Sequence, residues 1–178
     1  MLHIYQKEKS MITYQQLCKQ QTQYRTTLIN RKRKLQELVG EFARAILDDL
    51  GLTGKGYRDE PLKSTIAKPY VRILELESGK QEDVIPFKLP VSFDDKGNPL
   101  SEAGICITLE ENENTYPKTH IYIRIQFKLI GEQLILAFLD FDEEMQITVN
   151  LDDSDNEKWH YAVQSYKEMV MRSCTLPC

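Results

Sequence analysis

The feature that most constrains the fold of this 178-residue chain is a succession of short segments in which apolar and polar residues alternate. In residues 120–129, HIYIRIQFKL, one side carries Ile121, Ile123, Ile125, Phe127 and Leu129, and the other carries Tyr122, Arg124, Gln126 and Lys128. A period of two residues is typical of a β-strand with one buried face. Similar patterns in residues 70–77, 104–110 and 145–151 predict further strands of the same kind.

The connections between these segments predict a mainly antiparallel sheet of about six strands. They are short, and Gly131-Glu132 fits a tight hairpin turn. Residues 133–141 are apolar on both sides, so we expect this strand in the middle of the sheet. Residues 85–93 also alternate, but Pro86 and Pro90 fall on the outward side, which predicts an edge strand or an extended arm.

A long helix is predicted ahead of the strands, over residues 13–50. Thr13 suits an N-cap and Gly51 suits a stop. Apolar residues recur at spacings of three, four and seven, at Tyr14, Leu17, Tyr24, Leu28, Leu35, Leu38, Val39, Phe42, Ile46 and Leu50. Gly40 weakens a helix by about 1 kcal/mol relative to Ala, which allows a break near that residue.

The two halves of this helix differ in the width of the apolar face. From Leu35 onward the face is wide, as in helices that pack on a core. Before Leu35 it is narrow and heptad-like, and Gln21 and Arg31 interrupt it. The first half is therefore either a coiled-coil seam or a helix that projects from the body.

A second helix is predicted near the C-terminus, where Trp159, Ala162, Val163, Tyr166, Met169 and Val170 share one face. The fold class is therefore α+β: a long N-terminal helix, a mainly antiparallel sheet, and a C-terminal helix packed with the first on one sheet face. We expect the other sheet face to be largely polar.

Composition and the order of segments divide the chain into five parts. We expect a flexible N-terminus (1–12), the long helix (13–50), a loop (51–66), an α+β body (67–173) and a flexible tail (174–178). Met11 could serve as an alternative start to Met1. No signal peptide or membrane span is visible, and Cys18, Cys106, Cys174 and Cys178 are scattered, which favours free thiols in the cytoplasm.

Charge is unevenly distributed along the chain, whose net charge is −4. Residues 1–50 hold nine basic against five acidic residues, and the remainder holds fourteen against twenty-two. Between Lys128 and Lys158 there are nine acidic residues and no basic one. A basic N-terminal part beside an acidic body suits self-association, internal docking or an external partner.

The most basic segment is LINRKRKLQELV, residues 28–39, with four basic residues in succession. Because each helical residue turns by 100°, these four side chains point in different directions and form no single patch. Arg33 is placed to pair with Glu37 on the solvent-exposed side of the helix, whereas Arg31 occupies the apolar seam and Lys32 borders it. For Arg31 we expect a protein carboxylate as partner rather than a phosphate.

The first functional hypothesis is a non-catalytic interaction or assembly protein that binds another protein or its own copy as a homo-oligomer. Its partner-binding residues would be Tyr14, Leu17, Gln21, Tyr24, Leu28, Arg31 and Lys32. A second surface on the polar sheet face would comprise Arg72, Tyr122, Arg124, Gln126 and Lys128. We expect no cofactor, no metal and no catalytic residue, because His3, His120 and His160 stand in no recognisable motif.

Two alternatives stay open. Residues 19–34 could bind nucleic acid, although an isoelectric point of about 5.5 counts against it. A metal-dependent enzyme could use carboxylates at two chain turns, namely Asp140, Asp142, Glu143 and Glu144, and Asp152, Asp153 and Asp155.

Overall fold

The computed structural model describes residues 12–60, 66–76, 81–140 and 145–174. Its first element is the 36-residue helix α1 (Tyr14–Asp49), as predicted. Thr13 caps the helix: the Gln16 N–H donates to Thr13 Oγ1 at 3.3 Å, and the Gln16 side chain accepts from the Thr13 N–H at 2.8 Å. The chain leaves the helix at Gly51, whose φ of +64° is easily reached only by glycine.

The break allowed for at Gly40 is absent, because α1 continues through that residue. A Cβ atom on Gly40 would lie 2.9 Å from Cγ of Pro86. The glycine therefore serves the close approach of another segment to the helix, at a cost in helix propensity.

The main sheet has seven strands within the described residues, and every pairing is antiparallel. The strands are β3 (Val71–Glu75), β4 (Glu82–Asp83), β5 (Ser92–Phe93), β6 (Pro99–Leu109), β7 (Thr119–Ile130), β8 (Gln133–Phe138) and β9 (Met145–Asn150). Their order is β4-β3-β6-β7-β8-β9, and β5 pairs with one end of β6. The hairpin between β7 and β8 turns at Gly131 and Glu132, with φ of +56° at Gly131.

A separate two-stranded sheet begins within residues 51–66, for which the sequence predicted a loop. β1 (Gly56–Tyr57) pairs with β2 (Lys68–Pro69). Tyr57 is buried against the rings of Tyr70 and His120, with centroids 5.6 and 5.7 Å away. Because Tyr57 lies among glycines and its ring partners are distant in the sequence, the local pattern predicted a loop there.

The predicted strand over residues 85–93 is wrong for most of its length. Pro86–Lys88 form the 3₁₀ turn η1, and only Ser92 and Phe93 join the sheet. The side-chain amide of Gln36, on α1, donates to the carbonyl oxygens of Phe87 at 3.0 Å and Leu89 at 2.8 Å. These bonds to the helix replace a strand ladder that two prolines could not have completed.

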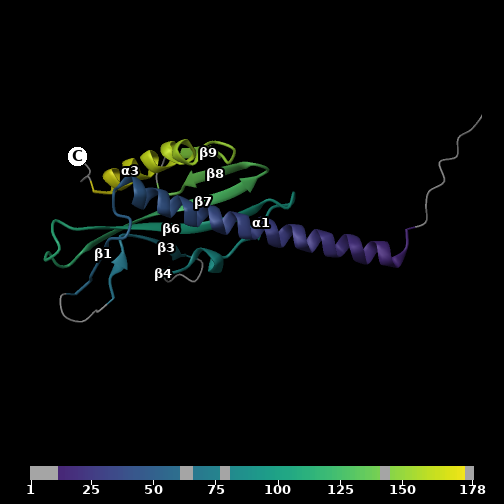
Figure 1. The fold of residues 1–178 in the computed structure, drawn as a ribbon, viewed down its shortest axis with the longest axis horizontal. Coiled ribbons are helices and arrows are strands. Elements are labelled where there is room, and N and C mark those ends of the chain that lie inside the picture. The colour runs from purple at the N-terminus through teal and green to yellow at the C-terminus, as the bar shows by residue number, and fades with distance from the viewer. Residues whose placement is uncertain (1–11, 61–65, 77–80, 141–144, 175–178) are drawn as a thin grey trace, which may run out of the picture.

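The chain ends in the short helix α2 (Asp155–Lys158) and the predicted C-terminal helix, α3 (His160–Cys174). Phe42 of α1 joins the layers, with ring centroids 6.0 Å from Phe127 of β7, 5.6 Å from Trp159 and 6.2 Å from Tyr166 of α3. Helices α1 and α3 therefore pack on one face of the sheet, which confirms the predicted α+β class (Figure 1). Across the residues described, no helix has the length and apolar character that a membrane span requires.

Candidate interaction surfaces

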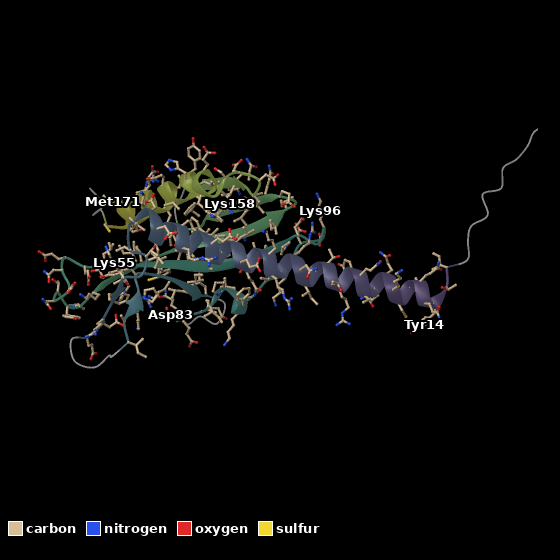
Figure 2. The ribbon with its side chains drawn as sticks, in the orientation of Figure 1. Tyr14, Lys55, Asp83, Lys96, Lys158 and Met171 are labelled. Carbon is tan, nitrogen blue, oxygen red and sulfur yellow. The ribbon has the colours of Figure 1, made fainter. Side chains whose placement is uncertain are left out.

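The N-terminal part of α1 extends beyond the body, as Figures 1 and 2 show. We call residues 12–27 the arm; every side chain in it is exposed. Tyr14, Leu17 and Tyr24 are 80%, 57% and 55% exposed, and Gln21 lies between them on the same helical face. Four of the seven predicted partner-binding residues thus belong to one uncovered stripe.

Leu28 and Arg31 lie where the arm joins the body. Arg31 Nη1 donates to the carbonyl oxygen of Gly97 at 2.8 Å, and a methyl group on Gly97 would lie 3.7 Å from Leu28 Cδ2. Gly97 sits in the turn between β5 and β6, with φ of +72°. The group that Arg31 contacts within the chain is therefore a backbone carbonyl rather than the carboxylate we expected. Lys32, the seventh residue, is exposed just beyond this junction.

The arm and the junction carry charge of one sign only. Residues 12–36 contain six basic residues and no acidic one, whereas residues 37–178 contain 15 basic and 26 acidic residues, a net charge of −11. The basic side chains point around the whole helix, because successive residues turn by 100°. A cationic helix therefore projects from an anionic body.

The basic residues predicted for the second surface are each paired with a carboxylate. Their partners are Asp83 for Arg72 at 2.8 Å, Glu102 for Arg124 at 2.8 Å, and Asp94 for Lys128 at 2.9 Å. Lys128, with the Asn98 and Lys96 N–H groups, holds the pKa of Asp94 far below its usual range. Tyr122 is exposed and Gln126 half-buried on the same strand. The face is polar, as expected, but its cations are already neutralised.

A hydroxyl, an imidazole and a carboxylate lie in sequence on that face, beside β1. Thr108 Oγ1 and His120 Nδ1 are 2.9 Å apart, and His120 Nε2 lies 3.4 Å from Asp59. Catalysis by such a relay requires the hydroxyl to reach a substrate. Thr108 is only 2% exposed and lines no cavity found among the described residues. The arrangement anchors the β1–β2 sheet on β6 and β7.

The buried thiol beside this cluster also has a structural character. Burial raises the pKa of Cys106, although Arg72 Nη2 lies 3.5 Å from its sulfur and opposes that effect. Within the described residues, no three His, Cys, Asp or Glu side chains are grouped as metal ligands would be. The predicted carboxylates at 142–144 lie outside the described residues.

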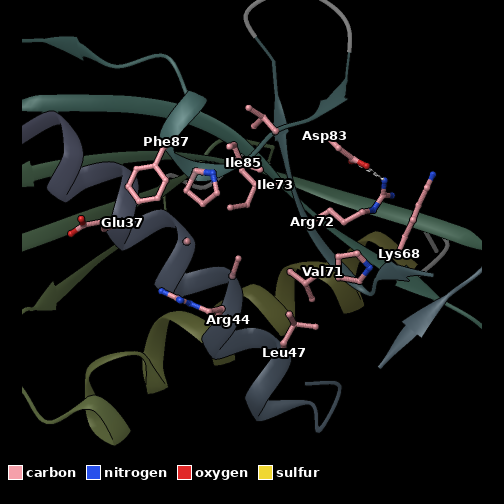
Figure 3. Close-up of a pocket in the computed structure, with 15 residues that line it drawn as sticks. Glu37, Arg44, Leu47, Lys68, Val71, Arg72, Ile73, Asp83, Ile85 and Phe87 are labelled. Carbon is pink, nitrogen blue, oxygen red and sulfur yellow. Dashed lines mark hydrogen bonds and ion pairs between the residues drawn. The ribbon is translucent and has the colours of Figure 1, made fainter. Parts of the chain in front are cut away.

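A groove of about 620 Å³ between α1 and the edge of the sheet was missed by sequence reasoning (Figure 3). One wall is α1, with Gly40, Ala43 and Leu47; the other is formed by β3 and the segment from Asp83 to Phe87. Ile85 and Phe87 are 59% and 61% exposed at its rim. Their presence beside two prolines, and a glycine inside a long helix, were the signals that could have indicated it.

Comparison of the chain with models of known families, with curated proteins and with solved structures gives no match.

Proposed function

We propose that the protein is a non-catalytic assembly or adaptor protein whose arm docks on an acidic, partly apolar surface of another protein chain. The observation that carries this proposal is the change in burial along one helical face. In steps of seven residues along α1, Tyr14 leads to Phe42 and Leu17 leads to Leu38, so both pairs lie on the same helical face. The body buries Phe42 and Leu38 almost completely, whereas Tyr14 and Leu17 are exposed to solvent.

An uncovered apolar stripe on a helix supports docking for an energetic reason. Helical segments without tertiary contacts are only marginally stable in water, and most helical stability in proteins comes from packing of the apolar face. The arm has no side chain packed on the body. A partner surface would supply that packing, in the manner of a helix in a groove.

The charges indicate which kind of surface fits. Arg25 and Lys32 flank the stripe at positions seven residues apart, and no carboxylate accompanies them before Glu37. Two arms paired along their stripes would bring like charges together, which disfavours a symmetric coiled coil of two arms. An acidic surface fits better, and the body of a second copy, with its net charge of −11, is one such surface.

Light scattering of the full chain at rising concentration, in low and high salt, tests this proposal. If the partner is a second copy of the chain, we expect a mass above that of the monomer at low salt. If the partner is a different protein, a photo-cross-linking probe at Gln21 should form cross-links to an acidic surface of that protein. Replacing Leu17 and Tyr24 by Glu should abolish the association. The matched control replaces Thr22 and Thr26, exposed on the opposite face of the arm. A monomer without cross-links, or equal loss in both variants, would overturn the proposal.

Nucleic-acid binding is the second candidate, supported by the six basic and no acidic residues in residues 12–36. Binding of single-stranded RNA and duplex DNA should then weaken steeply with salt, and Lys32→Ala with Arg33→Ala should flatten the slope. The paired cations on the sheet face add nothing to such a surface. Affinity that does not change with salt would exclude this candidate.

A further inference from the structure

The outer edge of β9 is open within the described residues, where the strand pairs with β8 alone (Figure 1). Directly after the last paired residue of β9, the Leu151 N–H donates to the Glu132 carbonyl at 3.0 Å. The backbone polar groups of Leu151 and of every second residue before it therefore face β8. Those of Gln146, Thr148 and Asn150 face outward. All three residues are exposed, so another chain can reach this edge.

The sequence of β9 does not protect its edge from pairing with another strand. Soluble proteins usually block an open edge with a proline, a lysine, a bulge or a very short strand. β9 has six residues, MQITVN, with no proline and no charge. The opposite edge of the sheet is formed by β4, which has two residues, both acidic. Of the two edges, the edge of β9 is therefore the better suited to strand addition.

A groove of about 570 Å³ lies beside this edge, between β9 and the segment that leads through α2 into α3. On the β9 side it is lined by Ile147 and Val149, whose side chains point toward the helices and join the core. The other wall includes Asp153, Glu157 and the exposed ring of Tyr161. A strand added to β9 would point every second side chain into this groove.

The groove carries negative charge that the described basic residues do not neutralise. Asp153 and Glu157 are exposed, and neither forms an ion pair with a described residue. Lys158, which also lines the groove, pairs with Glu41 of α1 at 3.1 Å, and its side chain is only 10% exposed. The unpaired carboxylates favour a basic side chain in a chain that lies in the groove.

Two copies of β9 do not suit each other as partners. In an antiparallel pair of these strands, the end of one would lie beside the beginning of the other. Asp152 and Asp153 follow β9 in the sequence, and Glu143 and Glu144 precede it, so acidic residues of the two chains would be brought together. Like charges placed opposite each other destabilise strand pairs. The fitting occupant is therefore a different segment.

We propose that the edge of β9 binds an extended segment of another protein, which adds to the sheet as a strand and carries a basic residue two positions from an apolar one. The apolar side chain lies opposite Ile147, beside Tyr161. The basic side chain lies nearer the end of β9, where the Asp153 N–H donates to the Asn150 carbonyl at 3.3 Å. The spacing follows because alternate residues of a strand share one face. The proposal does not depend on the arm.

A library of random dodecapeptides displayed on phage, selected against the immobilised full chain, tests the proposal. The enriched peptides should share an apolar and a basic residue two positions apart. A synthetic copy should bind about tenfold more weakly to the variant with Asp153→Lys and Glu157→Lys. The matched control, Asp95→Lys with Glu111→Lys, makes the same change in net charge at exposed acids on the far side of the sheet and should leave the affinity unchanged.

Two further measurements distinguish strand addition from binding by charge alone. Thr148→Pro removes an outward N–H without breaking a hydrogen bond to β8, so the circular dichroism spectrum should be retained while peptide binding is lost. Bound peptide should also slow hydrogen exchange of the Gln146 and Thr148 amides, measured by NMR. The Ile147 and Val149 amides already face β8 and should change little. Should the proline variant lose its fold, hydrogen exchange decides the question.

The proposal is overturned if no peptide is enriched, if the peptide binds the charge-reversed variant and its control equally well, or if a folded Thr148→Pro variant binds normally. It is also overturned if bound peptide leaves the Thr148 amide unprotected. Slow exchange of the Thr148 amide in the chain without peptide would overturn it as well. In that case a segment of the chain itself, or of a second copy, would already occupy the edge.

Discussion

Lys118 is the one charged residue that is buried in the described part of the chain. It pairs with Glu110 and donates to the carbonyl oxygens of Asn112 at 3.2 Å and Glu113 at 3.0 Å. Glu110 also accepts a hydrogen bond from Tyr70, which with burial raises the pKa of Tyr70 to about 12. These contacts tie the connection between β6 and β7 to the start of β3.

Replacing Lys118 by Met should destabilise the protein by about 2–3 kcal/mol, because the variant leaves the Glu110 carboxylate mostly buried without its cation. Urea unfolding would measure the change in the free energy of unfolding. Lys96→Met, at an exposed lysine in the turn between β5 and β6, should cost little. Similar losses in the two variants would mean that the buried pair of Lys118 and Glu110 contributes no more to the free energy of unfolding than an exposed lysine does.

Glu110 should also contribute to stability at neutral pH. Hydrogen bonds from Lys118 and Tyr70 lower the pKa of Glu110 in the folded chain. The stabilisation is therefore present above the unfolded pKa, about 4.3, and is lost as pH falls through the folded value. Glu110→Gln should lower Tm at pH 7, and its difference from the unmodified chain should shrink toward pH 3. A constant difference would contradict this linkage.

Gly40→Ala should destabilise the protein although alanine favours helix. The gain in propensity is about 1 kcal/mol, whereas the new methyl group would lie 2.9 Å from the Pro86 ring, an overpacked contact that costs about 1–3 kcal/mol. In a background carrying Pro86→Ala the same substitution should become neutral or stabilising. This double-mutant cycle, measured by urea unfolding, would show no coupling if the contact were unimportant.

At the scale of elements, α1 combines two helical segments with different sources of stability. The half that follows Leu35 is held by the core, whereas the arm relies on propensity, capping and whatever partner covers it. Thr22→Pro should therefore reduce helicity by circular dichroism and leave the thermal unfolding of the body unchanged, followed by fluorescence of Trp159. Ala43→Pro, in the packed half, should unfold the body. A large fall in Tm from Thr22→Pro would show that the arm supports the fold.

Elements defined by local patterns could be predicted from the sequence. The long helix and strands such as β7 follow from side-chain period and capping residues. The turn η1 could not, because its alternation imitates a strand and its actual partner, Gln36, lies 51 residues earlier. The pairing of Arg124 with Glu102 depends on the register of β6 and β7, which a single sequence does not reveal. The groove combines α1, β3 and the segment from Asp83 to Phe87, so the only local signals for it were indirect, namely Gly40 within the helix and the two prolines beside exposed apolar residues.

At the scale of the whole molecule, the net charge of −4 conceals a separation of charge. The projecting part is cationic and the body anionic, so the chain has a strong electrical polarity along its length. Association through the arm should therefore weaken at high salt, where exposed charges are screened beyond about 8–10 Å. Association that persists at high salt would depend mainly on Tyr14, Leu17 and Tyr24.

The projecting helix also determines how the protein moves through a solvent. A compact chain of this length has a radius of gyration of about 16 Å, and the sixteen residues of the arm add an overhang of about 24 Å. Such a shape increases hydrodynamic friction far more than mass. On a gel-filtration column a monomer of 20.8 kDa should elute early, where a globular dimer would. Elution volume alone would therefore indicate a dimer where only an elongated monomer exists.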